Sequence, residues 1–107
     1  MGAPPDVSAA IFAALGDTRR LGLVSRLSER GPMSITKLAA GSDVTRQAIT
    51  KHLRTLEKAG IVRAERSGRK SIWQIETRRL DAARRVLDAI SKQWDGALGR
   101  LKALVED

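Results

Sequence analysis

The apolar residues of the segment 45–75 change their spacing at Gly60, and this change restricts the folds open to the chain. Before Gly60 they recur at steps of three and four residues, the spacing of a helix with one buried face, at Ile49, Leu53 and Leu56. After Gly60 come two β-prone runs, IVRAER and KSIWQI, on either side of a Ser67-Gly68 turn. The segment is therefore predicted to form a helix followed directly by a β-hairpin.

The side of this helix opposite its apolar stripe is basic and polar. Thr45 is predicted to cap the helix, and the polar side comprises Gln47, Lys51, Arg54 and Lys58, flanked by Arg46 and Thr50. Three further cations bracket the hairpin turn: Arg66, Arg69 and Lys70. Long hydrogen-bonding side chains suit base edges and phosphates, so the helix is predicted to enter the major groove of duplex DNA. The hairpin tip is then expected to reach phosphates or the adjacent minor groove.

The residues ahead of this segment predict three more helices and one short strand. A first helix is expected over 8–16. A second, capped by Asp17, is expected to end at Gly31-Pro32 and to face three apolar side chains inward: Leu21, Val24 and Leu27. The run PMSI can supply one strand. Ser34 then caps a third helix that Gly41 ends, and the short GSDV turn to the basic helix completes a helix-turn-helix.

The net charge of +8 is concentrated in the middle of the chain. Residues 41–79 hold ten Lys/Arg and four Asp/Glu, a balance of +6, whereas residues 1–40 carry +2 and residues 80–107 balance to zero. A local excess of this kind favours a polyanionic partner, and nucleic acid is the commonest one. On charge alone, a clustered but solvated basic surface is an equal alternative.

A heptad repeat of apolar residues fills the C-terminal part of the chain. Its positions alternate steps of three and four residues without a break: Leu80, Ala83, Leu87, Ile90, Trp94, Ala97, Leu101 and Leu104. A helix this long exposes more apolar surface than a small core can cover, so part of it is expected to meet a second copy. The expected dimer contacts are Leu87, Ile90, Trp94, Ala97, Leu101 and Leu104. Gly96 and Gly99 each weaken helicity by about 1 kcal/mol relative to Ala, which leaves the continuity of the helix open.

The order of these elements and three stretches of sequence resemble the ArsR/SmtB family of bacterial winged-helix repressors over residues 8–107. The stretches are ALGDTRRLGLVSRL, DVTRQAITKHLRTLEKAGIV and SGRKSIWQI, of which the second is the most specific. The resemblance implies a mainly α-helical winged helix-turn-helix with a small β-hairpin wing and a long C-terminal dimerisation helix. It also implies a homodimer that binds palindromic operators and represses transcription until an effector loosens it.

The resemblance also implies roles for single residues. These are a cap for Thr45, base contacts for Arg46, Gln47 and Thr50, and positions at or beside the DNA backbone for Lys51 and His52. His52 also lies at the margin of the apolar stripe, so a structural hydrogen bond is an equal alternative. Arg19 stands where the family has Thr in an Asp-x-Thr-Arg pattern, which bears on the geometry of the cap at Asp17. Trp73 is expected in the core or an interface in preference to stacking on a base.

The ligands expected of a metal sensor are missing from this sequence. Metal-responsive members carry a Cys pair near the third helix, or His and acidic ligands on the final helix. This chain has no Cys, and its single His lies outside residues 78–107. Asp81, Asp88 and Asp95 share one face of the final helix, where a solvated stripe is the better interpretation. The chain thus resembles the metal-independent branch of the family, with no cofactor and an unknown effector.

Three other classes of function compete with a sequence-specific regulator. An enzyme needs a nucleophile–base pair or clustered carboxylates in a pocket, and one His without Cys in a small chain makes this class improbable. A sequence-indifferent nucleoid-associated protein, or an RNA-binding winged helix, is the main alternative. Arg46 and Gln47 argue against it, because backbone binders need only Lys and Arg. A protein-interaction module built on the final helix alone would leave the +6 segment unexplained.

The domain organisation expected from these features is one small unit with three parts. Residues 1–7 are expected as a disordered tail, residues 8–79 as the DNA-binding domain, and residues 80–107 as the dimerisation helix packed on that domain. No apolar run approaches the ~18 residues of a membrane span, and the first residues lack the layout of a signal peptide. A cytoplasmic location is therefore expected.

Overall fold

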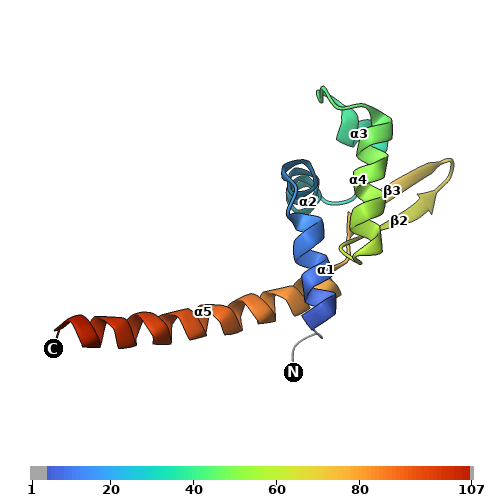
Figure 1. Ribbon diagram of the computed structural model, residues 1–107. Helices are drawn as coiled ribbons and strands as arrows, with labels where there is room; N and C mark the ends of the chain where they lie inside the picture. The colour runs from blue at the N-terminus through green and yellow to red at the C-terminus, as the bar shows by residue number, and fades with distance from the viewer. Residues whose placement is uncertain (1–4, 107) are drawn as a thin grey trace.

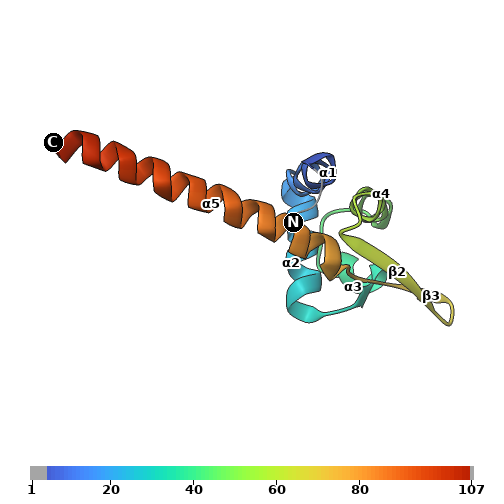
Figure 2. The same cartoon turned by 90° about the horizontal axis from the view of Figure 1, so that it is seen from below.

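The computed structural model describes residues 5–106, which form helices and one small sheet (Figure 1). In chain order the elements are α1 Pro5–Leu15, α2 Thr18–Arg30, β1 Met33–Ser34, α3 Ile35–Ala39, α4 Arg46–Lys58, β2 Val62–Ser67, β3 Lys70–Ile75 and α5 Thr77–Glu106. The first four helices and the sheet pack into one body, and α5 extends away from it (Figures 1 and 2). The predicted class, mainly helical with a winged helix-turn-helix and a long final helix, is confirmed.

The first helix starts earlier than predicted. α1 begins at Pro5, three residues before the expected start at Ser8, so the last three residues of the expected tail are helical. Proline is tolerated in the first turn of a helix, because its missing N–H has no partner there and its fixed φ suits the helix. The expectation for residues 1–4 falls outside the described residues.

The three predicted helix caps are all formed. The Asp17 carboxylate accepts hydrogen bonds from the backbone N–H groups of Arg19, at 2.9 Å, and Arg20, at 3.1 Å. The bond from Arg20 is the main cause that lowers the pKa of Asp17 below its ordinary value. Arg19, the departure from the family pattern, therefore leaves this cap intact. Ser34 accepts from Lys37 N at 3.3 Å, and Thr45 accepts from Ala48 N at 3.1 Å.

The sheet is antiparallel with the strand order β1-β3-β2. β2 and β3 form the predicted hairpin, in register from Val62 opposite Ile75 to Ser67 opposite Lys70. The two-residue turn is therefore Gly68-Arg69, one position later than expected. Gly68 has a φ of 62°, a left-handed conformation that glycine adopts without strain, so the turn sits where the glycine is. β1 pairs with β3, with Met33 opposite Trp73.

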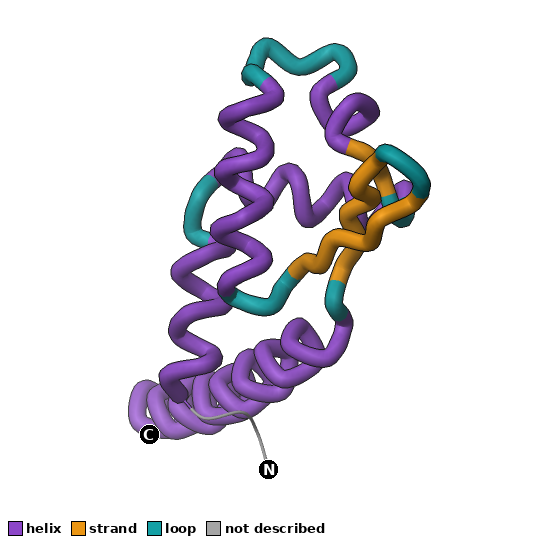
Figure 3. Tube along the Cα trace, turned by 90° about the vertical axis from the view of Figure 1, so that its right-hand side faces the viewer, coloured by secondary structure: helices purple, strands orange, loops and turns teal. Residues whose placement is uncertain are grey.

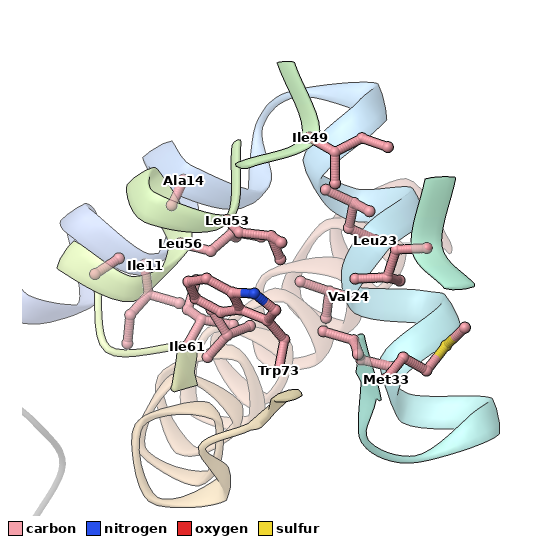
Figure 4. Close-up of a cluster of buried hydrophobic side chains, with 14 of the residues drawn as sticks. Ile11, Ala14, Leu23, Val24, Met33, Ile49, Leu53, Leu56, Ile61 and Trp73 are labelled. Carbon is pink, nitrogen blue, oxygen red and sulfur yellow. The ribbon is translucent and has the colours of Figure 1, made fainter. Parts of the chain in front are cut away.

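The core of the body is centred on Trp73, whose side chain is 1% exposed (Figure 4). Around it lie apolar side chains from every helix of the body and from the sheet: Ile11, Leu23, Val24, Leu27, Met33, Leu38, Ile49, Leu53, Leu56, Ile61 and Val62. Trp73 was expected in the core or an interface, and the structure places it in the core. The expectation for Leu21 was wrong, because Leu21 is 52% exposed and Leu23 is buried instead. The 100° helical step puts Leu21 about 120° from Leu27, outside the buried stripe.

α5 is a single helix that continues through Gly96 and Gly99. Its first turns pack on the body, where Ala83 is buried and Leu80 contacts the core. Figure 3 shows α5 crossing one end of the body, with the strands beside the helices above it. A helix of 30 residues is about 45 Å long, so most of α5 lies beyond the body. None of the described helices has the length and apolarity needed to cross a lipid bilayer.

Candidate nucleic-acid interface

α4 presents one side to the core and the opposite side to solvent. Ile49, Leu53 and Leu56 are buried, as predicted. The exposed positions are Thr45, the cap, and then Arg46, Gln47, Lys51, Arg54, Thr55 and Lys58. Thr50 and His52 are half-buried and lie on opposite flanks of the apolar stripe. The hydroxyl of Thr50 donates a hydrogen bond to the Arg46 carbonyl at 2.8 Å, so its proton is used within the helix.

The tip of the wing lies beside the start of α4. Arg46 from α4, with Arg69 and Lys70 from the hairpin, lines one surface hollow of about 240 Å³. Ser34, Ile35, Thr36 and Ser71 complete its lining, and no Asp or Glu takes part. Three cations without a local counter-charge raise the positive potential of this hollow, which we call the basic hollow. The fold thus brings together cations that the sequence places more than twenty positions apart.

Two hydroxyl residues of the basic hollow, Thr36 and Ser71, were missed in the sequence. Thr36 lines the basic hollow because the pairing of β1 with β3 holds the start of α3 against the wing. A two-residue strand has no alternation that reveals its partner, so this neighbourhood could not be read from the pattern. Ser71 carried a usable signal, because it lies next to Lys70 and opposite Arg66 in the hairpin. Arg66 itself is exposed on β2.

Arg54 is engaged inside the protein as well as being exposed. One guanidinium nitrogen lies 2.9 Å from a carboxylate oxygen of Glu57, and the guanidinium carbon lies 5.2 Å from the centroid of the Trp73 ring. A cation over an indole face is attracted by the ring quadrupole. The Nε1 of Trp73 is buried and has no hydrogen-bond partner among the described residues. Arg54 therefore links α4 to the wing strand β3.

His52 lies away from the solvent-facing side of α4. It lines a second hollow together with residues of α2, of α3 and of the turn between α3 and α4, among them Arg19, Leu38 and Val44. This position is the margin of the apolar stripe that the helical wheel indicated, on the flank opposite Thr50.

The far part of α5 exposes a continuous apolar surface. Of the residues expected at the dimer contact, all are exposed: Leu87, Ile90, Trp94, Ala97, Leu101 and Leu104. Trp94 is 64% and Leu104 is 77% exposed, and Leu98 and Val105 widen the stripe. Large apolar side chains gathered at this density on a solvent-facing helix mark an interaction surface.

The acidic face of α5 does not gather into a metal centre. Asp81, Asp88 and Asp95 are all exposed. Asp81 and Asp88 line a surface hollow with Arg84 and Arg85, so each has guanidinium groups nearby. In the part of the chain that the structure describes, no three His, Cys, Asp or Glu side chains come together in a way that could hold a metal ion.

Comparison with known proteins places this architecture among transcriptional regulators. A family model described as a helix-turn-helix domain matches residues 6–65. The HTH-type transcriptional regulator Rv2034 of Mycobacterium tuberculosis is 32% identical over 95 residues, which cover 89% of this chain and 85% of the relative. The HTH-type transcriptional repressor SmtB of the same species is 30% identical over 101 residues, which cover 90% and 73%.

Solved structures agree with the sequence comparisons. An ArsR-like transcriptional regulator from Rhodococcus sp. RHA1 matches with a TM-score of 0.76 and 33% identity, covering 92% of each chain. Coverage of this extent makes the similarity one of overall architecture. The relatives of this chain are regulators of transcription, which are not enzymes. The chain belongs to the ArsR family of winged helix-turn-helix transcriptional regulators, which bind DNA.

Proposed function

We propose that this protein is a homodimeric, cytoplasmic repressor that binds a palindromic DNA operator and does not respond to metal ions. The observation that carries the proposal is the basic hollow, where Arg46 at the start of α4 meets Arg69 and Lys70 of the wing. A helix start beside a basic wing tip fits duplex DNA, with α4 in the major groove and the wing on the flanking backbone.

The side chains of α4 divide into two proposed roles. Arg46 and Gln47, exposed in the first turn, have the forked geometry that reads guanine and adenine edges. Thr50 is proposed beside them, through its acceptor lone pairs, since its proton is already donated to Arg46 O. Lys51 and the wing residue Arg66 are proposed to contact phosphates, as point charges that neutralise the backbone.

Two further α4 residues need a change of position or partner to reach DNA. Arg54 would have to leave Glu57 and the Trp73 ring, so a contact from it to DNA competes with an internal one. His52, on the flank facing α2, is proposed only for the backbone at the margin of the interface. Thr45 is proposed to orient the helix through its cap, since that bond fixes the first turn.

The exposed apolar residues of α5 support the proposal of a dimer, and the symmetry of such a dimer supports a palindromic operator. α5 extends away from the body (Figure 1), and its heptad residues from Leu87 to Leu104 remain exposed to solvent among the described residues. A two-fold pair of such helices holds two α4 helices at a fixed distance. Successive major grooves on one face of DNA are about 34 Å apart, and a symmetric dimer requires a palindromic site.

Repression and metal independence have separate supports. SmtB, a relative at 30% identity, is named a transcriptional repressor, and a protein bound at an operator blocks transcription without any further activity. The chain has no Cys and one His, whereas transition-metal sensors use thiolate or imidazole ligands. Zinc, cadmium or arsenite added to the protein–operator complex should therefore release no DNA. Release at stoichiometric metal, reversed by a chelator, would overturn this part.

Footprinting of the DNA upstream of the protein's own gene tests the proposal. Two protected half-sites, with centres about 10–10.5 base pairs apart or a multiple of this, are expected. The affinity for this site should exceed that for random DNA of equal length and salt by about a thousandfold or more. Equal affinity for the two DNAs would instead favour a sequence-indifferent nucleoid-associated protein.

A further inference from the structure

The second hollow, on the other side of α4 from the wing, has the features of a small-molecule site. Its volume is about 320 Å³, close to the lower end of the roughly 300–1,000 Å³ range of ligand pockets. Leu23 from α2, Leu38 from α3, Val44 from the turn and Ile49 from α4 supply its apolar lining. It lies between three helices and the turn of the helix-turn-helix, and we call it the α2–α4 hollow.

Gly22 keeps the α2–α4 hollow open. It lies inside α2, where glycine is destabilising relative to alanine because it loses more conformational freedom on folding. Neither of the usual reasons for a glycine applies. Its φ is not in the left-handed region, and a Cβ added there would meet no heavy atom within 4 Å. Arg19 and Arg26, at i−3 and i+4, line the hollow from the same helix face, so a side chain at position 22 would project over it.

The polar groups of the α2–α4 hollow select for negative charge. They include Arg19, Arg26 and His52, and no Asp or Glu lines it. Arg26 is fixed in the wall, because its guanidinium donates hydrogen bonds to the Leu38 carbonyl at 2.6 Å and the Lys37 carbonyl at 3.3 Å. Arg19 is exposed at the rim and makes its cap contact to Asp17 through the backbone N–H, which leaves the guanidinium for a ligand. An apolar floor with cations at its edge complements an amphipathic anion.

We propose that the α2–α4 hollow binds a small organic carboxylate with a compact apolar body, and that binding lowers the affinity for DNA. The second clause rests on the proposed function. A negative charge held against the flank of α4 is carried on the same helix as Arg46 and Lys51, the cations proposed to attract phosphates. Exposed charges act on one another over about one Debye length, ~8 Å, so the bound anion reduces the attraction for DNA. The ligand therefore weakens DNA binding, and by linkage DNA weakens ligand binding by the same factor.

Ligand binding is tested without DNA, on the ¹⁵N-labelled full chain at constant ionic strength. Benzoate, cyclohexanecarboxylate and hexanoate are the probes, and uncharged benzamide is the matched control. We expect saturable changes in the chemical shifts of the backbone amides of Gly22, Leu38 and Val44 with at least one carboxylate. Benzamide should bind at least about tenfold more weakly than benzoate. Absence of saturation with all three carboxylates, or equal binding of benzoate and benzamide, overturns the proposal.

Two variants locate the site. Gly22→Leu fills the hollow and should raise the dissociation constant for the carboxylate about tenfold or more. Its melting temperature should not fall, since leucine is the better helix former and finds free space. Ser28→Leu, exposed about 120° around the same helix from Gly22 and outside the lining of the hollow, should bind as the wild type does. Arg19→Gln should weaken the carboxylate about fivefold without changing benzamide binding. Undiminished carboxylate binding by Gly22→Leu would place the ligand elsewhere.

The regulatory clause has its own measurement. The saturating carboxylate should lower the affinity of the wild-type protein for its operator, and the effect should vanish in Gly22→Leu, whose DNA affinity without ligand is unchanged. A ligand that fills the hollow without changing DNA affinity refutes regulation. A wild-type protein that binds no DNA at all refutes the proposed function instead, and the DNA-free titration distinguishes the two failures.

Discussion

A comparison of Arg46 with Lys51 tests base reading separately from phosphate contact. Both side chains are exposed on α4, and they are proposed to contact a base edge and a phosphate, respectively. Arg46→Ala should cost about 1–3 kcal/mol of operator binding and relax specificity at one position per half-site, because it removes the side chain proposed to make a bidentate contact to guanine. Lys51→Ala should weaken all sequences alike and flatten the salt dependence by roughly one unit for each lost phosphate contact. Titrations of operator and random DNA at several salt concentrations measure both effects. Equal losses on the two DNAs in Arg46→Ala would remove it from the base edge.

Arg54 allows a second test at this scale, because its guanidinium lies over a buried ring. Arg54→Ala should lower the free energy of unfolding by about 0.5–1 kcal/mol through the lost contact with Trp73. Lys58→Ala, exposed on the same helix, is the control and should unfold as the wild type does. Urea unfolding followed by tryptophan fluorescence in a Trp94→Phe background reports on Trp73 alone. Wild-type stability with weaker operator binding would assign Arg54 to DNA instead.

At the scale of the elements, the wing tests whether the basic surface binds DNA. Replacing Arg66, Arg69 and Lys70 together by Ala should change stability by less than about 0.5 kcal/mol, because all three are exposed. DNA affinity should fall, and the slope of log K against log salt should decrease by roughly 0.9 for each phosphate contact removed.

A matched triple variant separates the wing from overall charge. Arg85, Lys92 and Lys102 are exposed on α5, outside the heptad seam, and their replacement by Ala removes the same net charge. This control should bind DNA more tightly than the wing variant. If the two variants lose affinity equally, only net charge matters and the hairpin points away from DNA.

The whole molecule is 66 Å long and 21 Å across its thinnest direction, and α5 accounts for this shape. An exposed helix with a seam of large apolar side chains is expected to be covered by a second copy. Trp94→Ala should raise the dissociation constant of the dimer, because tryptophan contributes most where it is desolvated in an interface. Operator affinity should fall with it, although no DNA contact changes.

Analytical ultracentrifugation with and without operator measures this prediction. Lys92→Ala, on the polar side of α5, is the control and should leave the dimer unchanged. A wild-type monomer at micromolar concentration would contradict the dimer, and an unchanged dimer in Trp94→Ala would contradict the role of this residue.

What the sequence determined by itself is local. The caps at Asp17, Ser34 and Thr45, the buried stripe of α4 and the hairpin all depend on residues a few positions apart. Such features follow from local hydrogen-bond geometry and from periodicity, and a short stretch of sequence contains all the residues that these depend on. The continuity of α5 is local as well: Ala97, Leu98 and Arg100 are strong helix formers that offset Gly96 and Gly99, and the pattern left this balance open.

Only the tertiary structure decided which distant residues meet. The pairing of β1 with β3 holds α3 beside the wing and closes the basic hollow, and no periodicity in two residues specifies that partner. The same holds for Arg54 over Trp73 and for the α2–α4 hollow, whose walls come from three helices. Periodicity tells which face of an element is buried but not which neighbour buries it, because that choice depends on how all the faces fill one core.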